Sequence, residues 1–228
     1  MPAGEFGAAA LAVFRHTLAR LERPVIGLPT GRTPVPLYHE MALERFAFPE
    51  DARLFAIDEY CSPSPHPGTN AAFFARYLPE PAYPLVRVPL HDAVNPEAEI
   101  RTFCREIGAA GGFDLAVLGI GNNGHIAFNE PGSGSESCCR AVELAAPTRA
   151  QVANQWEPAP THGMTIGMAD LLSARCLVLL ASGAAKAAIL AAALQGPMTP
   201  DVPASLLQAH SAVTVVCDVD AGALLRKP

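Results

Sequence analysis

Residues 113–131, with the sequence FDLAVLGIGNNGHIAFNEP, constrain the fold of this chain most strongly. Residues 115–120 form a nearly unbroken aliphatic run, which is typical of a strand buried on both faces of a parallel sheet. The run ends in a glycine-rich turn, and His125, Asn129 and Glu130 follow it directly. Ligands bind beyond the carboxyl ends of the strands in an open α/β sheet, so the sequence predicts an active site at this turn.

Strand-like and helix-like segments alternate along the rest of the chain. Strands are expected at 25–28, 54–57, 85–88, 141–144, 176–181 and 212–217. Helices are expected at 4–22, 34–45, 70–77, 97–109, 148–156 and 184–195. This alternation predicts a single Rossmann-like, doubly wound α/β domain over residues 1–228, with a mostly parallel sheet flanked by helices.

The composition restricts the class of protein. Half of the residues are apolar and 17% are charged, which provides enough apolar sequence for a full core. The formal net charge is -6 and the basic residues are scattered, which argues against a nucleic-acid partner. No apolar stretch reaches the length of a membrane span and no cleavable signal pattern is present, so we expect no membrane association.

The six cysteines show neither CxxC spacing nor the density of a disulfide scaffold, which favours a reducing, cytoplasmic location. Cys104, Cys176 and Cys217 lie in apolar sequence and are interpreted as small buried hydrophobic residues. Cys138 and Cys139 are adjacent in a polar loop and are interpreted as free thiols, because metal binding lacks further ligands at suitable spacing. No metal site is predicted.

The turn after the first strand combines Thr30, Gly31, Arg32 and Thr33 ahead of an expected helix. Backbone N–H groups at a helix N-terminus, together with two hydroxyl groups, suit a phosphate dianion. The alternative is an ordinary strand-to-helix turn with Thr33 as the N-cap residue, and this alternative is favoured when the turn is considered alone.

Two acidic residues, Asp58 and Glu59, directly follow the second expected strand. Successive side chains alternate along a strand, so one of the two can face a ligand while the other is structural. A single aspartate at a strand end more often caps a loop. Its place beside the other two turns, at one edge of a parallel sheet, favours a functional role.

The pair His125 and Glu130 is a candidate proton shuttle, because a carboxylate can orient an imidazole that titrates near neutral pH. The alternative is a structural histidine. Lys186 lies at the start of an expected helix, where the helix dipole disfavours a cation. It is either a solvated surface lysine or a second phosphate contact.

Taken together, these residues resemble the glucosamine-6-phosphate deaminase family, within the wider group that includes 6-phosphogluconolactonases. The lactonases resemble the earlier part of the central loop but lack its FNEP continuation. The matching segments, in family order, are GLPTGRTP (27–34), DEY (58–60), GIGNNGHIAFNEPG (119–132), SGAAKA (182–187) and PASLLQAH (203–210).

The resemblance implies conversion of D-glucosamine 6-phosphate and water to D-fructose 6-phosphate and ammonium. It implies no metal or organic cofactor, a sugar phosphate as the small-molecule partner, and a possible homo-oligomer. By similarity, His125 assists opening of the pyranose ring, and Glu130 holds and polarises the His125 imidazole. Asp58 moves a proton from C2 toward C1. The implied catalytic residues are Asp58, Asn123, His125 and Glu130, and the implied substrate-binding residues are Thr30, Gly31, Arg32, Thr33, Gly124 and Lys186.

Three positions depart from the family pattern. Asn123 stands where some members carry an aspartate in the histidine relay. Trp156 stands where a family arginine helps to bind phosphate, and Arg32 is a candidate replacement for that charge. Residues 68–70, Gly-Thr-Asn, resemble the lactonases. The alternatives are therefore a 6-phosphogluconolactonase-like hydrolase, a deaminase of another hexosamine phosphate and, from a different class, a non-catalytic sugar-phosphate sensor.

Overall fold

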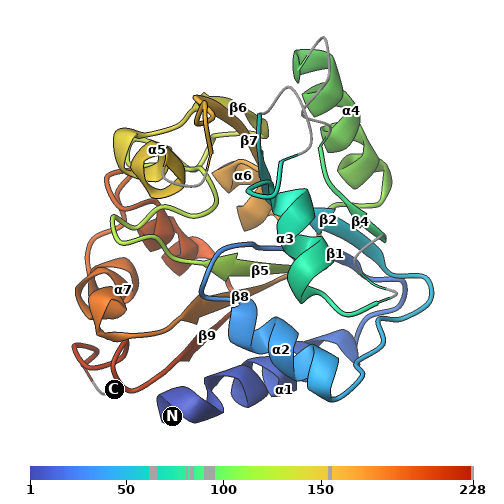
Figure 1. Cartoon of the computed structure of the whole chain (residues 1–228). Helices are drawn as coiled ribbons and strands as arrows, with labels where there is room; N and C mark the ends of the chain where they lie inside the picture. Colours follow the sequence, from blue (N-terminus) through green and yellow to red (C-terminus); the bar gives the residue numbers. More distant parts are fainter. Residues whose placement is uncertain (62–65, 81, 83–84, 90–95, 154–155, 227–228) are drawn as a thin grey trace.

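A six-stranded parallel sheet in the order β4-β2-β1-β5-β8-β9 forms the centre of the computed structural model (Figure 1). The structure describes residues 1–61, 66–80, 82, 85–89, 96–153 and 156–226. The strands are β1 (Val25–Leu28), β2 (Arg53–Ala56), β4 (Val86–Arg87), β5 (Leu115–Gly119), β8 (Cys176–Ala181) and β9 (Val213–Cys217). The chain builds one half of the sheet outward from β1 and the other half outward from β5, so the strand order reverses between these two strands.

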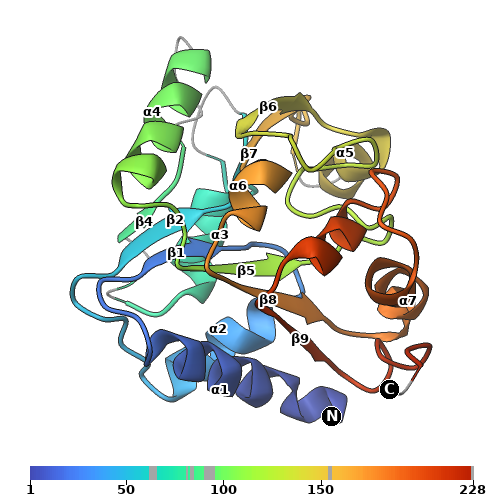
Figure 2. The same ribbon diagram turned by 180° about the vertical axis from the view of Figure 1, so that it is seen from behind.

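Helices cover both faces of this sheet, and the alternation of side chains along the strands decides which helices each face receives. Ile26 and Leu115 pack with α1, α2 and α3, whereas Val25 and Ala116 pack with the side that carries α4, α6 and α7. Figure 2 shows α6 and α7 from behind. The helices are α1 (Phe6–Leu18), α2 (Val35–Leu43), α3 (Asn70–Tyr77), α4 (Pro96–Ala109), α5 (Ala146–Ala153), α6 (Met168–Leu172) and α7 (Ala187–Gln195). The predicted doubly wound α/β class is confirmed.

A second, antiparallel sheet in the order β3-β7-β6 lies beside the first and was not predicted. Its strands are β3 (Asp58–Tyr60), β7 (His162–Thr165) and β6 (Arg140–Glu143). β3 follows β2 almost directly and pairs with β7, which is more than a hundred positions away in the sequence. Such a short strand has too few residues to show a period, so only the pairing reveals it.

Several boundaries differ from the expected ones, and at two helix starts a short 3-10 turn replaces the first turn of the helix. The segments η1 (Ala3–Glu5) and η3 (Ala184–Lys186) precede α1 and α7, and η4 (Pro203–Ala209) and α6 were not predicted. The expected helix at 148–156 begins and ends earlier, at Ala146–Ala153; residues 154 and 155 lie outside the described part of the chain. No helix among the described residues is both long and apolar enough to cross a bilayer.

Candidate active site

A cavity of about 400 Å³ opens where the strand order reverses, at the carboxyl ends of β1, β5 and β8. This is the position at which open α/β sheets bind ligands. Of the predicted site residues, the structure brings seven to its wall: Thr30, Gly31, Arg32, Thr33, Asp58, His125 and Lys186. Asn123, Gly124 and Glu130 belong to the same loop as His125 but do not line the cavity.

The imidazole of His125 is held from behind by Glu130, whose Oε2 lies 3.3 Å from His125 Nδ1. The contact has the distance of an ion pair but not the alignment of a hydrogen bond, and within the described residues Nδ1 has no hydrogen-bond partner. Asn123 closes the arrangement, because its Nδ2 donates to Glu130 Oε2 at 2.7 Å and its Oδ1 accepts from the His125 backbone at 3.2 Å. Asn123 thus orients the carboxylate, but its neutral amide adds no negative charge to the relay.

Glu130 stays ionised over the whole range in which a histidine titrates. Burial alone would raise its pKa, but the adjacent His125 imidazole, together with hydrogen bonds from Thr148 and Asn123, outweighs burial and lowers the pKa to about 2. Thr148 donates to Oε1 at 2.7 Å from the first turn of α5. A permanent carboxylate favours a proton on Nδ1, so Nε2 is the ring nitrogen available to a ligand. The sequence carried no signal for Thr148.

Gly121 provides the space in which the His125 ring lies. A Cβ atom at Gly121 would come within 2.4 Å of the ring atoms Cε1 and Nε2, far inside van der Waals contact. Gly124 is required for a different reason, because its φ of 85° lies in the left-handed region and its missing side chain leaves room for Val202. Gly124 is buried and shapes the turn, so the predicted role in substrate binding is not supported by direct contact with the cavity.

Asp58 is a nearly buried carboxyl group at the floor of the cavity, with 8% of its surface exposed. Burial, and then the charge of neighbouring Glu59, raise its pKa to about 7. Asn70 holds the side chain, because its Nδ2 donates to Asp58 Oδ1 at 2.6 Å and to the Asp58 carbonyl oxygen at 2.9 Å. A carboxylate with this pKa is a stronger base than an exposed aspartate.

Glu59 has the structural role expected for one of the two acidic residues. Its carboxylate accepts hydrogen bonds from the backbone N–H groups of Asn70 and Ala71, at 2.8 and 2.9 Å, and so caps the N-terminus of α3. Thr69 adds a side-chain cap by accepting from the Ala72 N–H at 3.2 Å. Residues 69 and 70 therefore connect the start of α3 to Asp58. Sequence reasoning noted this segment only as a resemblance to lactonases.

The opposite part of the cavity wall is cationic. Arg32 is exposed and Lys186 is half-buried, and no ion pair is found for either side chain among the described residues. Burial, and then the positive charge of Arg32, lower the pKa of Lys186. Two adjacent cations without a counter-ion form a binding site for an anion.

Two strand-end turns shape this cationic region. Gly31 has a φ of 90°, and Thr30 and Thr33 line the wall on either side of it. The alternative in which Thr33 caps α2 is wrong, since Pro34 is the N-cap residue and the helix has no side-chain cap hydrogen bond. Buried Asp218 holds the other turn by accepting from Ser182 Oγ at 2.7 Å and from the Gly183 N–H at 2.9 Å. Neither Ser182 nor Asp218 was predicted from the sequence to contribute to the site.

Asn129 points into the protein and anchors the His125 loop. Its Nδ2 donates to the carbonyl oxygens of Ile126 and Ile166, at 3.0 and 2.8 Å, and Arg140 donates to its Oδ1 at 3.0 Å. The side chain is fully buried. The loop is thereby attached to β6 and to the end of β7, which explains how the unpredicted sheet contributes to the site.

Trp156 lies outside the cavity wall and is buried. Its indole stacks on His66, with 4.2 Å between the ring centroids, and makes a T-shaped, edge-to-face contact with Tyr60. Gly68 lies against the indole, where a Cβ atom would come within 2.7 Å of Trp156. The tryptophan therefore contributes packing beneath Tyr60, which does line the cavity, and brings no charge to it.

The thiols contribute nothing to this site. All six cysteines are free, and Cys104, Cys176 and Cys217, interpreted from the sequence as buried, are only partly buried, although Cys176 and Cys217 pack against the core. Within the described ranges, no group of three His, Cys, Asp or Glu side chains has the arrangement of a metal site.

Residues 3–216 match the family model described as "Glucosamine-6-phosphate isomerases/6-phosphogluconolactonase". A glucosamine-6-phosphate deaminase of Bacillus pumilus (strain SAFR-032) is 35% identical over 96% of this chain and 95% of its own length. The corresponding protein of Cutibacterium acnes (strain DSM 16379 / KPA171202) is 39% identical over 88% of this chain and 81% of its own.

Solved structures give the same picture of the fold. A monomeric glucosamine-6-phosphate deaminase superposes with a TM-score of 0.88 at 30% identity, over 98% of this chain and 97% of that one. A 6-phosphogluconolactonase from Trypanosoma cruzi superposes with a TM-score of 0.77 at 21% identity, over 99% of this chain and 94% of that one. At that identity the second structure shows a shared fold alone.

Proposed function

The chain belongs to the glucosamine-6-phosphate isomerase/6-phosphogluconolactonase family, and from this premise we propose that it converts D-glucosamine 6-phosphate and water to D-fructose 6-phosphate and ammonium. One observation carries the proposal: a buried carboxylate of raised pKa and a carboxylate-backed histidine face one cavity whose other wall is cationic. The names of its 35–39% identical relatives support the same reaction.

The cationic wall binds the phosphate. Arg32 and Lys186 supply the charge, and the Thr30 and Thr33 hydroxyls with the Gly31 backbone supply further hydrogen bonds. Binding energy from this non-reacting end of the sugar orients the reacting end between Asp58 and His125.

The chemical steps then divide between the two titratable groups. His125 transfers a proton between the C1 hydroxyl and the ring oxygen, which opens the pyranose, while Glu130 stabilises the imidazolium. Asp58 removes the C2 proton, gives an enolamine, and returns the proton to C1. The resulting imine at C2 adds water and releases ammonia, which leaves the ketone of fructose 6-phosphate.

The ionisation of Asp58 sets the expected pH dependence. A base must be deprotonated to act, and the pKa of Asp58 is raised to about 7. We expect kcat/KM to increase with pH below this value and to level above it. A profile that levels near pH 4, the ordinary range of an aspartate, would exclude Asp58 as the group whose ionisation limits the rate.

A lactonase reaction is the second candidate. Residues 68–70 resemble the lactonases, and Asn70 of this segment donates a hydrogen bond to Asp58. Lactone hydrolysis releases no ammonia. The decisive assay therefore measures ammonia and fructose 6-phosphate from glucosamine 6-phosphate, with galactosamine 6-phosphate and 6-phosphogluconolactone in parallel.

Equal release of ammonia and fructose 6-phosphate from the first substrate is the expected result. Turnover of the lactone alone would replace the proposal with hydrolysis, and turnover of the galactosamine epimer alone would redirect it to another hexosamine phosphate. Absence of turnover with all three would favour a sugar-phosphate sensor.

Replacing Arg32 with alanine tests the phosphate end. A hydrogen bond to a charged group contributes about 1.5–3 kcal/mol, so we expect KM to rise roughly 10- to 100-fold while kcat changes little. Arg20→Ala, which removes an exposed arginine at the end of α1, is the matched control and should leave both parameters unchanged. An unchanged KM in Arg32→Ala would remove Arg32 from the phosphate site.

Three broader predictions complete the proposal. The chain forms a single domain over residues 1–228, it acts in the cytoplasm, and a homo-oligomer is possible. The six free cysteines support a reducing compartment.

A further inference from the structure

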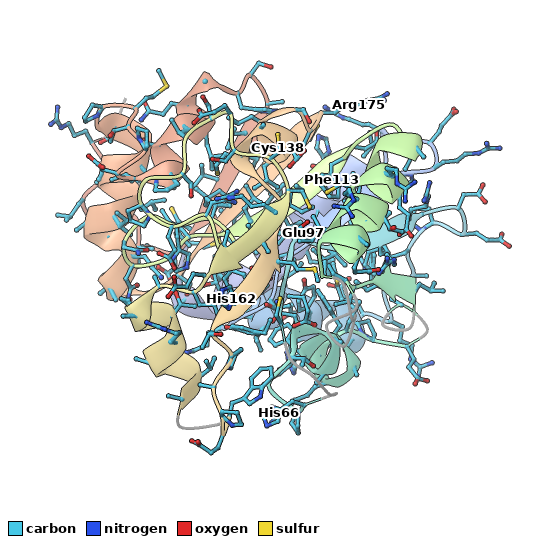
Figure 3. The ribbon with its side chains drawn as sticks, turned by 90° about the horizontal axis from the view of Figure 1, so that it is seen from above. His66, Glu97, Phe113, Cys138, His162 and Arg175 are labelled. Carbon is cyan, nitrogen blue, oxygen red and sulfur yellow. The ribbon has the colours of Figure 1, made fainter. Side chains whose placement is uncertain are left out.

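Two cysteines from distant parts of the sequence line one cavity outside the active-site wall, and one of them, Cys139, also packs behind Asp58. Cys104 lies on α4, and Cys139 lies immediately before β6, which packs against α4. The two thiols are close enough for each to shift the pKa of the other. Figure 3 labels the neighbouring Cys138, in the segment that leads into β6, and Glu97 on α4.

Cys104 and Cys139 are both partly exposed. They line an open cavity of about 560 Å³ together with Arg101 and Arg105, and the wall is completed by Ile100, Cys138 and Asp170. Arg101 and Arg105 add positive charge to this wall, whereas Asp170 adds a negative charge that opposes a thiolate on Cys104.

The two thiols differ in acidity. The neighbouring Cys139 thiol lowers the pKa of the Cys104 thiol and outweighs burial and the charge of Asp170, which both act in the opposite direction. The Cys104 thiol, followed by burial, raises the pKa of Cys139. Cys104 is therefore the better nucleophile of the two, and Cys139 holds a proton that an oxidised Cys104 can release.

We infer that Cys104 and Cys139 form a hydroperoxide-sensitive pair that closes to a disulfide. The Cys104 thiolate attacks one oxygen of hydrogen peroxide, the O–O bond breaks, and a sulfenic acid forms with loss of hydroxide, which takes up a proton to become water. Cys139 then attacks the Cys104 sulfur, its proton leaves with the hydroxyl group as a second water, and the S–S bond forms. Two thiols are oxidised by two electrons and one peroxide is reduced.

Cys138 is the competing partner and differs in its surroundings. It is exposed, and its sulfur contacts the Glu136 carbonyl oxygen at 3.6 Å rather than the pair. A bond between the adjacent residues Cys138 and Cys139 would close a strained eight-membered ring. The geometry therefore favours the link across the two elements.

Trypsin separates the two possibilities, because Cys104 lies in peptide 102–105 and both other thiols lie in peptide 106–140. The full-length protein is treated with hydrogen peroxide, alkylated, digested without reduction and analysed by mass spectrometry. We expect the two peptides to be joined in the wild type and in Cys138→Ser, and separate in Cys139→Ser and Cys104→Ser. Reduction should separate them in every case.

Three results would overturn the inference: a link that persists in Cys139→Ser, a disulfide confined to peptide 106–140, or sulfinic acid on Cys104 without any link. The wild-type digest alone can give the second and third results, so the test holds even if a variant fails to fold. None of these readouts depends on the proposed reaction, and loss of deaminase activity would leave the outcome unchanged.

Discussion

Asp58→Asn is expected to reduce kcat by about 100- to 10,000-fold, the usual contribution of a general base, while leaving substrate affinity largely intact. The amide retains an oxygen that can accept the short bond from Asn70, so the side chain keeps its place. Steady-state kinetics with direct measurement of substrate binding separates the two effects. A normal kcat would show that another group is the base.

The same substitution is expected to stabilise the fold at alkaline pH. The pKa of Asp58 is raised to about 7 in the folded protein, because burial and the charge of Glu59 disfavour the anion. The folded state therefore binds the proton more tightly than the unfolded chain, and the free energy of unfolding falls as pH rises from about 4 to about 7.

The amide of asparagine does not ionise, so the Asp58→Asn variant does not lose this stability as pH rises. At pH 8.5 the Asp58→Asn variant should exceed the wild type by about 2–4 kcal/mol in free energy of unfolding. At pH 4 the two proteins should be nearly equal. Denaturant unfolding at both pH values tests the expectation, and a variant less stable than the wild type at pH 8.5 would contradict it.

Glu59→Gln is the matched control, since it neutralises the neighbouring carboxylate. Glu59 caps α3 through backbone N–H groups, so its loss of charge should lower stability by about 1 kcal/mol instead of raising it. A gain of stability in Asp58→Asn and a loss of stability in Glu59→Gln would distinguish the active-site carboxylate from the structural one.

Gly121→Ala is expected to reduce kcat about 100-fold without contact between the new methyl group and the substrate. The added Cβ would lie 2.4 Å from His125 Cε1 and Nε2, so the imidazole must move. A displacement of about 1 Å in a reacting group can cost about 100-fold in rate. Gly108→Ala, on the exposed side of α4 with open space around the new methyl group, is the control and should retain full activity.

A double variant identifies the route of this effect. If Gly121 acts only by positioning His125, then Gly121→Ala should add almost nothing to the loss already caused by His125→Gln. If the reductions in kcat caused by Gly121→Ala and His125→Gln instead multiply in the double variant, Gly121 acts on the substrate or the fold by another route. Circular dichroism and the unfolding midpoint of each variant confirm that the fold is retained.

The sequence by itself determined the class of fold and the neighbourhood of the site. The aliphatic run at 115–120 and the shorter strands around it carry the information in consecutive residues, because burial on both faces of a parallel sheet excludes polar side chains. The glycine-rich turn and the following HIAFNEP segment also lie in one stretch of chain. The turns after β1 and β5 then had to meet, since the carboxyl ends of parallel strands share an edge.

The tertiary structure alone decided which side chains perform which tasks. Pairing of β3 with β7 turns Asp58 toward the cavity and Glu59 toward α3, which the alternation rule left undecided. Thr148, Asn70 and Asp218 gain their roles from contacts with Glu130, Asp58 and the Ser182 turn. The space over Gly121 likewise exists only once the loop has folded back on itself. Local periodicity reports burial, whereas a hydrogen bond between residues far apart in the chain depends on how the layers pack.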